Sequence, residues 1–286
     1  MRVFYLPAGD GQRLCVHHAP VGPARGVVLY LHPFAEEMNK SRRMAALGAR
    51  ALADAGFAVL QIDLLGCGDS SGDFADASWA AWLDDALLGA RWLQQQQAGA
   101  PLWRWGLRAG ALLTVQAAAL LTTPVHLLWW QPAQAGKPLL QQFLRLKAAA
   151  ELQQGDAKGT LERVKADLAA GRCVDVAGYN LAPALAAGLD AATLTLPDNV
   201  ARSVWLETST REPAQLLPAS ATRVAALQAA GHAVHGQAVN GPAFWQTQEI
   251  EDAPALIDAT VAALLSPAPL ARTTAQRADA AASLAG

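Results

Sequence analysis

Short apolar runs recur along the chain, and longer segments with alanine and leucine at helical spacing separate most of them. The apolar runs predict strands at residues 3–6, 14–17, 27–32, 58–63, 102–106, 125–130, 204–208 and 233–239. The helical spacing predicts helices at residues 44–55, 79–97, 109–121, 221–230 and 255–265. This alternation is typical of an α/β protein with a mainly parallel eight-stranded sheet and helices on both faces. The first two strands lie close together in sequence and predict an antiparallel edge.

A long segment without a predicted sheet strand separates the sixth and seventh strands, and we place an insertion at residues 134–199. Residues 139–153 and 160–170 have helical patterning, so the insertion is expected to form a helical lid. The core is then residues 1–133 and 200–265. Residues 266–286 are rich in alanine, proline, threonine and arginine, and we expect a flexible tail there.

Composition narrows the class of protein. Of the 286 residues, 52% are hydrophobic and 16% charged, which allows a large buried core. The net charge of −2 argues against a general nucleic-acid binder. Three widely spaced cysteines form no disulfide framework or metal motif, which fits a reducing compartment and predicts a cytoplasmic location. The apolar stretch 109–130 is long enough for a membrane span, but polar residues and Pro124 interrupt it, which favours a buried helix and strand.

The segment Gly106-Leu107-Arg108-Ala109-Gly110 has the frame of a nucleophile elbow. It follows a strand-like run and opens a helix, which is the context that the G-x-S-x-G motif requires. Arg108 stands where that motif has serine, and a guanidinium that stays protonated cannot attack a carbonyl group. The pattern predicts an α/β-hydrolase architecture whose chemistry is changed or lost.

Residues 62–72 resemble the D-x-x-G-x-G-x-S-x-G loop of α/β-hydrolases. The simplest interpretation is structural: the glycines allow tight turns, and Asp69 and Ser70 hydrogen-bond the local backbone. Cys67 occupies the position of this loop that can face a pocket. A buried free cysteine usually packs as a small apolar residue. A relocated nucleophile is the alternative role for Cys67.

A charged segment, residues 32–44, follows the third strand. In the α/β-hydrolase fold this region supplies one N–H group of the oxyanion hole. A solvated run of charges is the usual explanation for such a cluster, but its position beside the elbow favours a pocket role. We expect Glu36 or Glu37 to pair with Arg108, and ligand binding to depend on Lys40 and Arg43. The candidate pocket residues are His32, Phe34, Glu36, Glu37, Asn39, Lys40 and Arg43.

The other members of a catalytic triad are missing from the places where the fold would position them. Glu207 and Glu212 lie near the seventh strand without a convincing motif, and residues 239–249 after the last strand contain no histidine. Ser–His–Asp chemistry is therefore not supported. The residues expected to form the pocket wall are Leu107, Ala109, Phe244 and Trp245.

Residues 32–44, 60–70, 106–110 and 244–249 resemble the exosortase A system-associated hydrolase 2 family of the α/β-hydrolase superfamily. The resemblance covers nearly the whole chain, and residues 32–44 are its most specific part. It implies a bacterium that builds exopolysaccharide and sorts proteins with a PEP-CTERM signal. It also implies neighbouring genes for an acyl-CoA ligase-like enzyme, an acyl carrier protein and a decarboxylase, and hence an acyl, aminoacyl or glycan-linked substrate.

Two classes of function remain. In the first, a non-hydrolytic protein binds an acyl or anionic ligand, and the planar fork of Arg108 grips a carboxylate or phosphate. In the second, an esterase, thioesterase or acyltransferase uses a relocated nucleophile or an activated water, with Cys67 or a carboxylate of Glu36 or Glu37. The missing serine and histidine favour the first. We expect no metal, cofactor, nucleic acid or membrane span; a carrier-protein-bound ligand and a homo-oligomer stay open.

Overall fold

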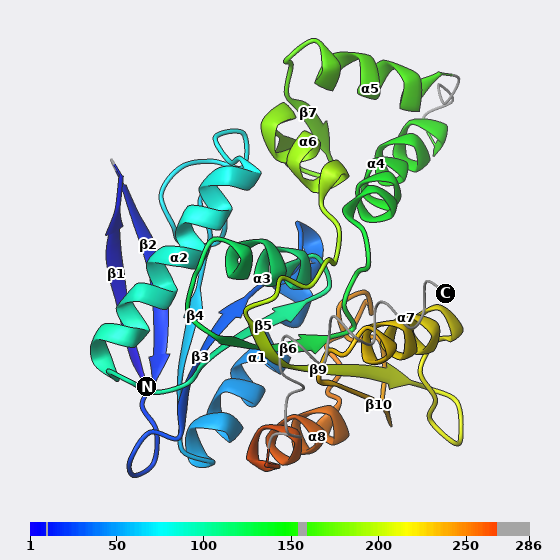
Figure 1. Cartoon of the computed structure of the whole chain (residues 1–286). Helices are drawn as coiled ribbons and strands as arrows, with labels where there is room; N and C mark the ends of the chain where they lie inside the picture. The colour runs from blue at the N-terminus through cyan, green and yellow to red at the C-terminus, as the bar shows by residue number, and fades with distance from the viewer. Residues whose placement is uncertain (10, 154–158, 268–286) are drawn as a thin grey trace.

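The computed structural model describes residues 1–9, 11–153 and 159–267, and an eight-stranded sheet runs through this part of the chain (Figure 1). The strands lie in the order β1-β2-β4-β3-β5-β6-β9-β10. Strand β2 is antiparallel to both β1 and β4, and all neighbours from β4 to β10 are parallel. The predicted α/β fold with a mainly parallel sheet is confirmed. The strands are β1 (Arg2–Ala8), β2 (Gly11–His18), β3 (Gly26–Leu31), β4 (Phe57–Ile62), β5 (Leu102–Leu107), β6 (Val125–Trp130), β9 (Val200–Ser209) and β10 (Val234–Asn240).

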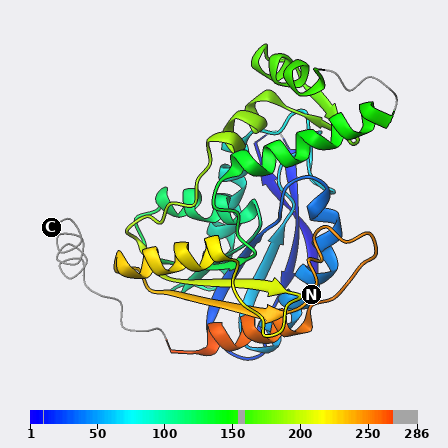
Figure 2. The ribbon, with the colours of Figure 1, turned by 90° about the vertical axis from the view of Figure 1, so that its right-hand side faces the viewer.

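Helices cover both faces of the sheet (Figure 2). Every residue of β3 and of β5 is buried, as expected for central parallel strands that have helices above and below. One face packs on α1 (Glu36–Asp54) and α8 (Pro254–Leu265). The other packs on α2 (Trp79–Gln96), α3 (Gly110–Ala119) and α7 (Pro218–Ala229).

Helix α1 begins eight residues earlier than the sequence pattern predicts, at Glu36 rather than Met44. The charged segment is therefore not a loop, because most of it forms the first two turns of this helix. Glu36 and Glu37 lie in the first turn, where a carboxylate favourably offsets the helix dipole. The many charged side chains in these turns hide the apolar spacing on which the prediction depended.

The insertion between β6 and β9 forms α4 (Gly136–Gln153), α5 (Thr160–Ala169), a hairpin of β7 (Val174–Val176) and β8 (Tyr179–Leu181), and α6 (Pro183–Ala191). It stands away from the sheet in Figure 1. Aromatic rings join it to the core, since Phe143 of α4 contacts Phe34 and Tyr179 contacts Phe74.

The apolar stretch 109–130 divides into α3 and β6, as predicted. Within the described residues, no helix has both the length and the apolar character that a membrane crossing requires. The predicted flexible tail begins at Ser266, and all of it from residue 268 onward lies outside the described residues.

Candidate functional site

The turn between β5 and α3, residues 106–110, has the geometry of a nucleophile elbow and is called the elbow below. Arg108 at its tip has a φ of 53°, in the left-handed region. This conformation costs a non-glycine residue about 1–2 kcal/mol, so the surrounding structure must hold it in place. One such restraint is the amide of Arg108, which donates a hydrogen bond to the carbonyl of Trp130 at the end of β6.

The two glycines of the elbow are required by close backbone contacts. A Cβ atom on Gly106 would overlap the backbone of Ala111 in α3. A Cβ atom on Gly110 would overlap the carbonyl oxygen of Leu31 at the end of β3. The elbow therefore packs its helix directly against two strands, and this packing does not depend on the side chain at position 108.

Arg108 pairs with Glu37 of α1, which confirms the prediction that a carboxylate of the charged segment contacts it. The Arg108 Nε atom lies 3.2 Å and 3.4 Å from the two carboxylate oxygens, and a terminal nitrogen lies 3.1 Å from Oε1. The exposed fractions of the two side chains are only 16% and 11%. The face of the guanidinium lies 5.6 Å from the ring of Trp245, within the range of a cation–π contact.

The two glutamates at the start of α1 have different surroundings. Burial raises the pKa of Glu37, and the nearby Arg108 opposes that shift. Burial also raises the pKa of Glu36, whose buried Oε2 atom has no hydrogen-bond partner among the described residues. Glu37 is therefore the carboxylate that neutralises Arg108, whereas Glu36 is half-buried and has no arginine partner among the described residues.

The backbone amides of Phe34 and Ala109 stand at the sequence positions that supply oxyanion-hole donors in this fold. Within the described residues, neither the amide of Phe34 nor that of Ala109 donates a hydrogen bond. In α/β-hydrolases these positions, in the β3–αA loop and directly after the nucleophile, supply the oxyanion-hole donors. The site thus keeps groups suited to bind an oxygen that carries negative charge, although no nucleophile stands at the elbow.

Cys67 does not have the environment of a nucleophile. It is buried, and burial together with the charge of Asp63 raises its pKa, which argues against the alternative role of a relocated nucleophile. His32 cannot serve as its base, because its Nδ1 atom bonds the Pro33 carbonyl and its Nε2 atom accepts from the Leu64 amide. The interpretation of the loop at residues 62–72 as structural fits this geometry. The buried His32 ring links the backbone at Pro33 to the backbone at Leu64.

Two other predicted pocket residues of the charged segment, Arg43 and Asn39, have partners away from Arg108. Arg43 forms a surface pair with Asp252, at distances of 2.8–3.1 Å, so its expected place in the pocket is corrected. Asn39 is exposed and donates a hydrogen bond of 3.4 Å to the hydroxyl group of Tyr179 in the insertion. Lys40 is half-buried and lies close enough to Glu37 to lower the pKa of that carboxylate slightly.

Of the four residues predicted to form the pocket wall, Trp245 lines a pocket, and the other three are almost fully buried. Leu107 and Ala109 are 0% and 1% exposed and belong to the core on opposite faces of the sheet. Phe244 is 1% exposed and packs its ring against Trp130. These three side chains stabilise the core beneath the elbow, since they have no free surface.

Among the residues that the structure describes, no acid–base pair lies at the elbow. Glu207 on β9 is buried and accepts hydrogen bonds from the Trp205 ring nitrogen and the Leu217 amide, each at 2.9 Å. His235 lies exposed on β10 rather than after it. The segment that follows β10 instead supplies Trp245, whose ring covers Arg108.

A pocket of about 310 Å³ lies at the carboxyl ends of β9 and β10, next to Trp245. No sequence motif predicted this pocket, although three consecutive hydroxyl residues at the end of β9, residues 208–210, were a usable signal. The amide oxygen of Gln131 accepts from the Thr208 amide and so orders one wall. Residues that give the pocket its polar character are Gln131, Thr208, Ser209, Thr210, Arg211 and Gln215.

On the insertion side, the space above the elbow is closed. Phe34 contacts Phe74 and Phe143, and Tyr179 contacts the same two rings, so four aromatic side chains fill this region. The cavity that remains there, beside Glu36 and Glu37, has a volume of about 20 Å³. That is room for about one water molecule and not for an acyl chain.

Comparisons with known proteins agree with this fold. Residues 22–151 match a family model described as serine aminopeptidase, S33 (Hydrolase_4), and this match covers less than half of the 286 residues. The human protein ABHD12B is 29% identical over 111 residues, which are 39% of this chain and 29% of that protein. The chain thus spans less than a third of this relative.

Solved structures extend the similarity over most of the chain. Est1E from Butyrivibrio proteoclasticus superposes with a TM-score of 0.62 at 14% identity and covers 92% of this chain and 97% of its own. A soluble variant of monoglyceride lipase from Saccharomyces cerevisiae, in complex with a substrate analogue, gives a TM-score of 0.59 at 12% identity, covering 92% and 93%. At such low identities, these likenesses establish the α/β-hydrolase fold.

Proposed function

We propose that this protein of the α/β-hydrolase superfamily binds an anionic ligand at the carboxyl end of its sheet without hydrolysing it. The observation that carries the proposal is Arg108 at the tip of the elbow, held there by Glu37. A guanidinium cannot act as the nucleophile, and the segment after β10 supplies a tryptophan where a base would be needed.

Arg108 keeps part of its binding capacity despite its pair with Glu37. The Nε edge of the fork and one terminal nitrogen face the Glu37 carboxylate. The other terminal nitrogen, Nη1, makes no hydrogen bond with the described residues. Because guanidinium groups have five N–H donors, this edge and the free amides of Phe34 and Ala109 can together bind the oxygens of a carboxylate or phosphate.

The shape of the site favours an anionic, polar ligand over a long acyl chain. Arg108 does not line the pocket beside Trp245, but Trp245 contacts both the guanidinium and the pocket. This pocket has a volume of about 310 Å³ and hydroxyl and amide groups on its walls, and the exposed Arg211 also lines it. The region toward the insertion retains only about 20 Å³. An acyl chain would require the aromatic rings of Phe34 and Phe143 to move apart.

The sequence resemblance suggests a biological setting for this ligand. We infer from residues 32–44 and 244–249 that the protein works in a bacterial exosortase and exopolysaccharide system, in the cytoplasm, as a pseudoenzyme with a helical lid. The ligand would then be an acyl, aminoacyl or glycan-linked anion, either free or attached to a carrier protein.

The test compares two arginine variants. Arg108→Lys keeps a charge that can pair with Glu37 but removes the planar fork of the guanidinium. We therefore expect the affinity for phosphate and acetate to fall by about tenfold. Arg43→Lys changes a surface arginine of α1 and is the matched control, for which we expect no change. Calorimetry and NMR titration would measure both. Equal affinity of the two variants would contradict the proposal.

Serine-directed labelling tests the non-hydrolytic part separately. A fluorophosphonate probe should label neither the wild-type protein nor Arg108→Ser, because the described site offers no base to activate a hydroxyl group. Stoichiometric labelling of one serine in the wild-type protein, mapped by mass spectrometry, would show that a serine hydrolase is present after all.

The alternative, an esterase, thioesterase or acyltransferase with a relocated nucleophile, depends on Cys67. Cys67→Ala should retain function in a complemented deletion strain, because burial raises the pKa of this thiol and His32 is fully engaged. The exposed Cys173 should react first with a thiol reagent, and Cys67 only after unfolding. A folded Cys67→Ala protein that fails to complement would favour the alternative.

A further inference from the structure

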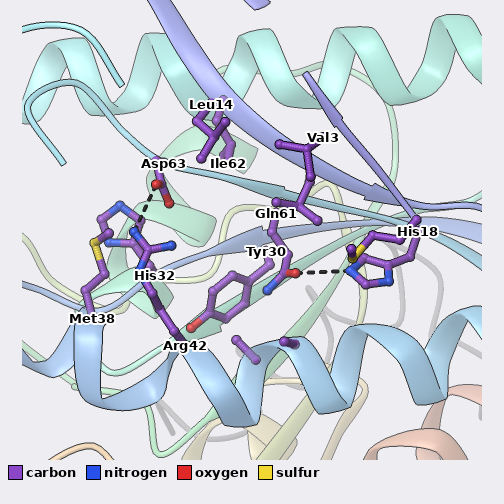
Figure 3. A pocket seen from close by; sticks show the side chains of 14 residues that line it. Val3, Leu14, His18, Tyr30, His32, Met38, Arg42, Gln61, Ile62 and Asp63 are labelled. Carbon is purple, nitrogen blue, oxygen red and sulfur yellow. Dashed lines mark hydrogen bonds and ion pairs between the residues drawn. The ribbon is translucent and has the colours of Figure 1, made fainter. Parts of the chain in front are cut away.

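A second pocket lies on the α1 face of the sheet, apart from the pocket beside Trp245, and has a volume of about 260 Å³. Its floor is a row of side chains that the strand register places side by side. Val3 pairs with Val16, Val16 with Gln61, and Gln61 with Tyr30, so the row crosses β1, β2, β4 and β3. Figure 3 shows Tyr30 and Gln61 between the sheet and the helix.

The opposite wall explains why space remains there. Helix α1 faces the row with Met38, Arg42, Ala45 and Ala46, which lie on one side of the helix by their spacing of three or four residues. Two of these four are alanines, whose side chains are too short to reach the row. The pocket opens toward the edge strand, where Val3 is 57% exposed.

Hydrogen-bonding groups without partners face this space. The Tyr30 ring is 5% exposed and packs 4.5 Å from the Trp105 ring, yet its hydroxyl makes no hydrogen bond with the described residues. The Gln61 amide accepts from the Nε2 atom of His18 at 3.3 Å, and its NH₂ group has no partner in the same part of the chain. Tyr30 is buried and Gln61 half-buried, and both line the pocket, so these two groups can hydrogen-bond a ligand there.

The two charged side chains that line the pocket, Arg42 and Asp63, neutralise each other. Arg42 pairs with Asp63 at 2.9 Å, and both line the same end of the cavity. Burial lowers the pKa of His18, so its ring is neutral at pH 7. A charged ligand would lose hydration on entering without finding an unpaired counter-charge among the side chains inside, because Met1, whose ammonium acts on His18, is exposed to solvent.

We propose that this pocket binds a compact uncharged molecule with an apolar body and a carbonyl or hydroxyl group at one end. The apolar body would lie on Val3, Val16 and Ala46, and the polar end would accept from the Gln61 amide and bond the Tyr30 hydroxyl. The size suits a single substituted ring. The site shares no lining residue with the pocket beside Trp245, so the proposal does not depend on the proposed function.

Four probes of similar size test the chemical class: benzamide, benzoate, benzylamine and toluene. NMR titration of the full-length protein should show saturable binding of benzamide, and weaker binding of the two charged probes and of toluene. Equal affinity for all four would overturn the assignment to uncharged hydrogen-bonding ligands. Absence of saturable benzamide binding would overturn the site itself.

Three variants test the location. Ala46→Phe should fill the cavity and abolish benzamide binding, and Val3→Trp should cover its mouth with the same result while changing only an exposed edge residue. Tyr30→Phe keeps the ring and should weaken binding about threefold to tenfold, the range for one lost hydrogen bond. Arg108→Lys should have no effect. Unchanged binding by Val3→Trp, or equal loss with Arg108→Lys, would place the probe elsewhere and overturn the proposal.

Discussion

Helix α1 contributes one residue to each of several arginine–carboxylate pairs, and two of these pairs differ in burial. They are the pair of Arg43 with Asp252 and the pair of Glu37 with Arg108. Arg43 and Asp252 make three hydrogen bonds of 2.8–3.1 Å, whereas Arg108 and Glu37 lie 3.1–3.4 Å apart. The exposed fractions are 56% and 35% for the first pair and 16% and 11% for the second. Water can replace either partner of the first pair but not of the second. The buried pair, with the poorer geometry, is therefore the one on which the structure depends.

Removal of Glu37 should have the largest effect. Glu37→Gln leaves the Arg108 charge in a site that excludes most water, and we expect a loss of about 2–4 kcal/mol in the free energy of unfolding. The value lies toward the lower end for buried pairs because Arg108 retains some exposure. Urea denaturation would measure it.

A double variant is the control. Glu37→Gln combined with Arg108→Met removes the unpaired charge, and it should be more stable than Glu37→Gln alone. If the two changes simply add, the pair contributes no coupling and the comparison with the surface pair fails.

Glu36→Gln should have a smaller, pH-dependent effect. Burial raises the pKa of Glu36 above its ordinary value of 4.5, so between these two pKa values the folded protein binds a proton that the unfolded chain has released. Stability from this group is fully present below pH 4.5 and is lost as the pH rises through the folded-state pKa. Glu36→Gln should therefore match the wild type in acid and be more stable at pH 7. Equal thermal midpoints at pH 7 would show that Glu36 has a partner or remains hydrated.

Arg43→Ala should have the smallest effect. Exposed ion pairs contribute little to stability, because both partners are hydrated when apart. We expect no measurable change in the urea midpoint or in phosphate binding, and the same for Asp252→Asn. A clear loss of phosphate binding by Arg43→Ala would restore the ligand role that the sequence pattern suggested for this residue.

The fold and the position of Arg108 could be predicted from the sequence because both depend on local patterns. Alternating apolar segments define the sheet, and two glycines four residues apart define the elbow. The contact between Arg108 and Glu37 could also be predicted, because the elbow and the β3–α1 connection meet at one edge of the sheet in this fold.

The remaining features depend on contacts between distant parts of the chain. Asp252 lies 209 positions from Arg43, so no local pattern reveals that it removes Arg43 from the site. The row from Val3 to Tyr30 exists only through strand register. The burial of Cys67 likewise follows from packing, which is why its raised pKa was not foreseen.

The close contacts of Gly106 and Gly110 also affect how this site can diverge. Both glycines are fixed by helix–strand packing, whereas the side chain at position 108 is held by its contacts with Glu37 and Trp245 and must suit a positive φ. During evolution, the residue at position 108 can therefore change while the turn keeps its conformation. Replacement of either glycine, in contrast, requires α3 to move. Searches that require serine at this position will pass over such descendants, while searches for the glycine frame alone will retain them.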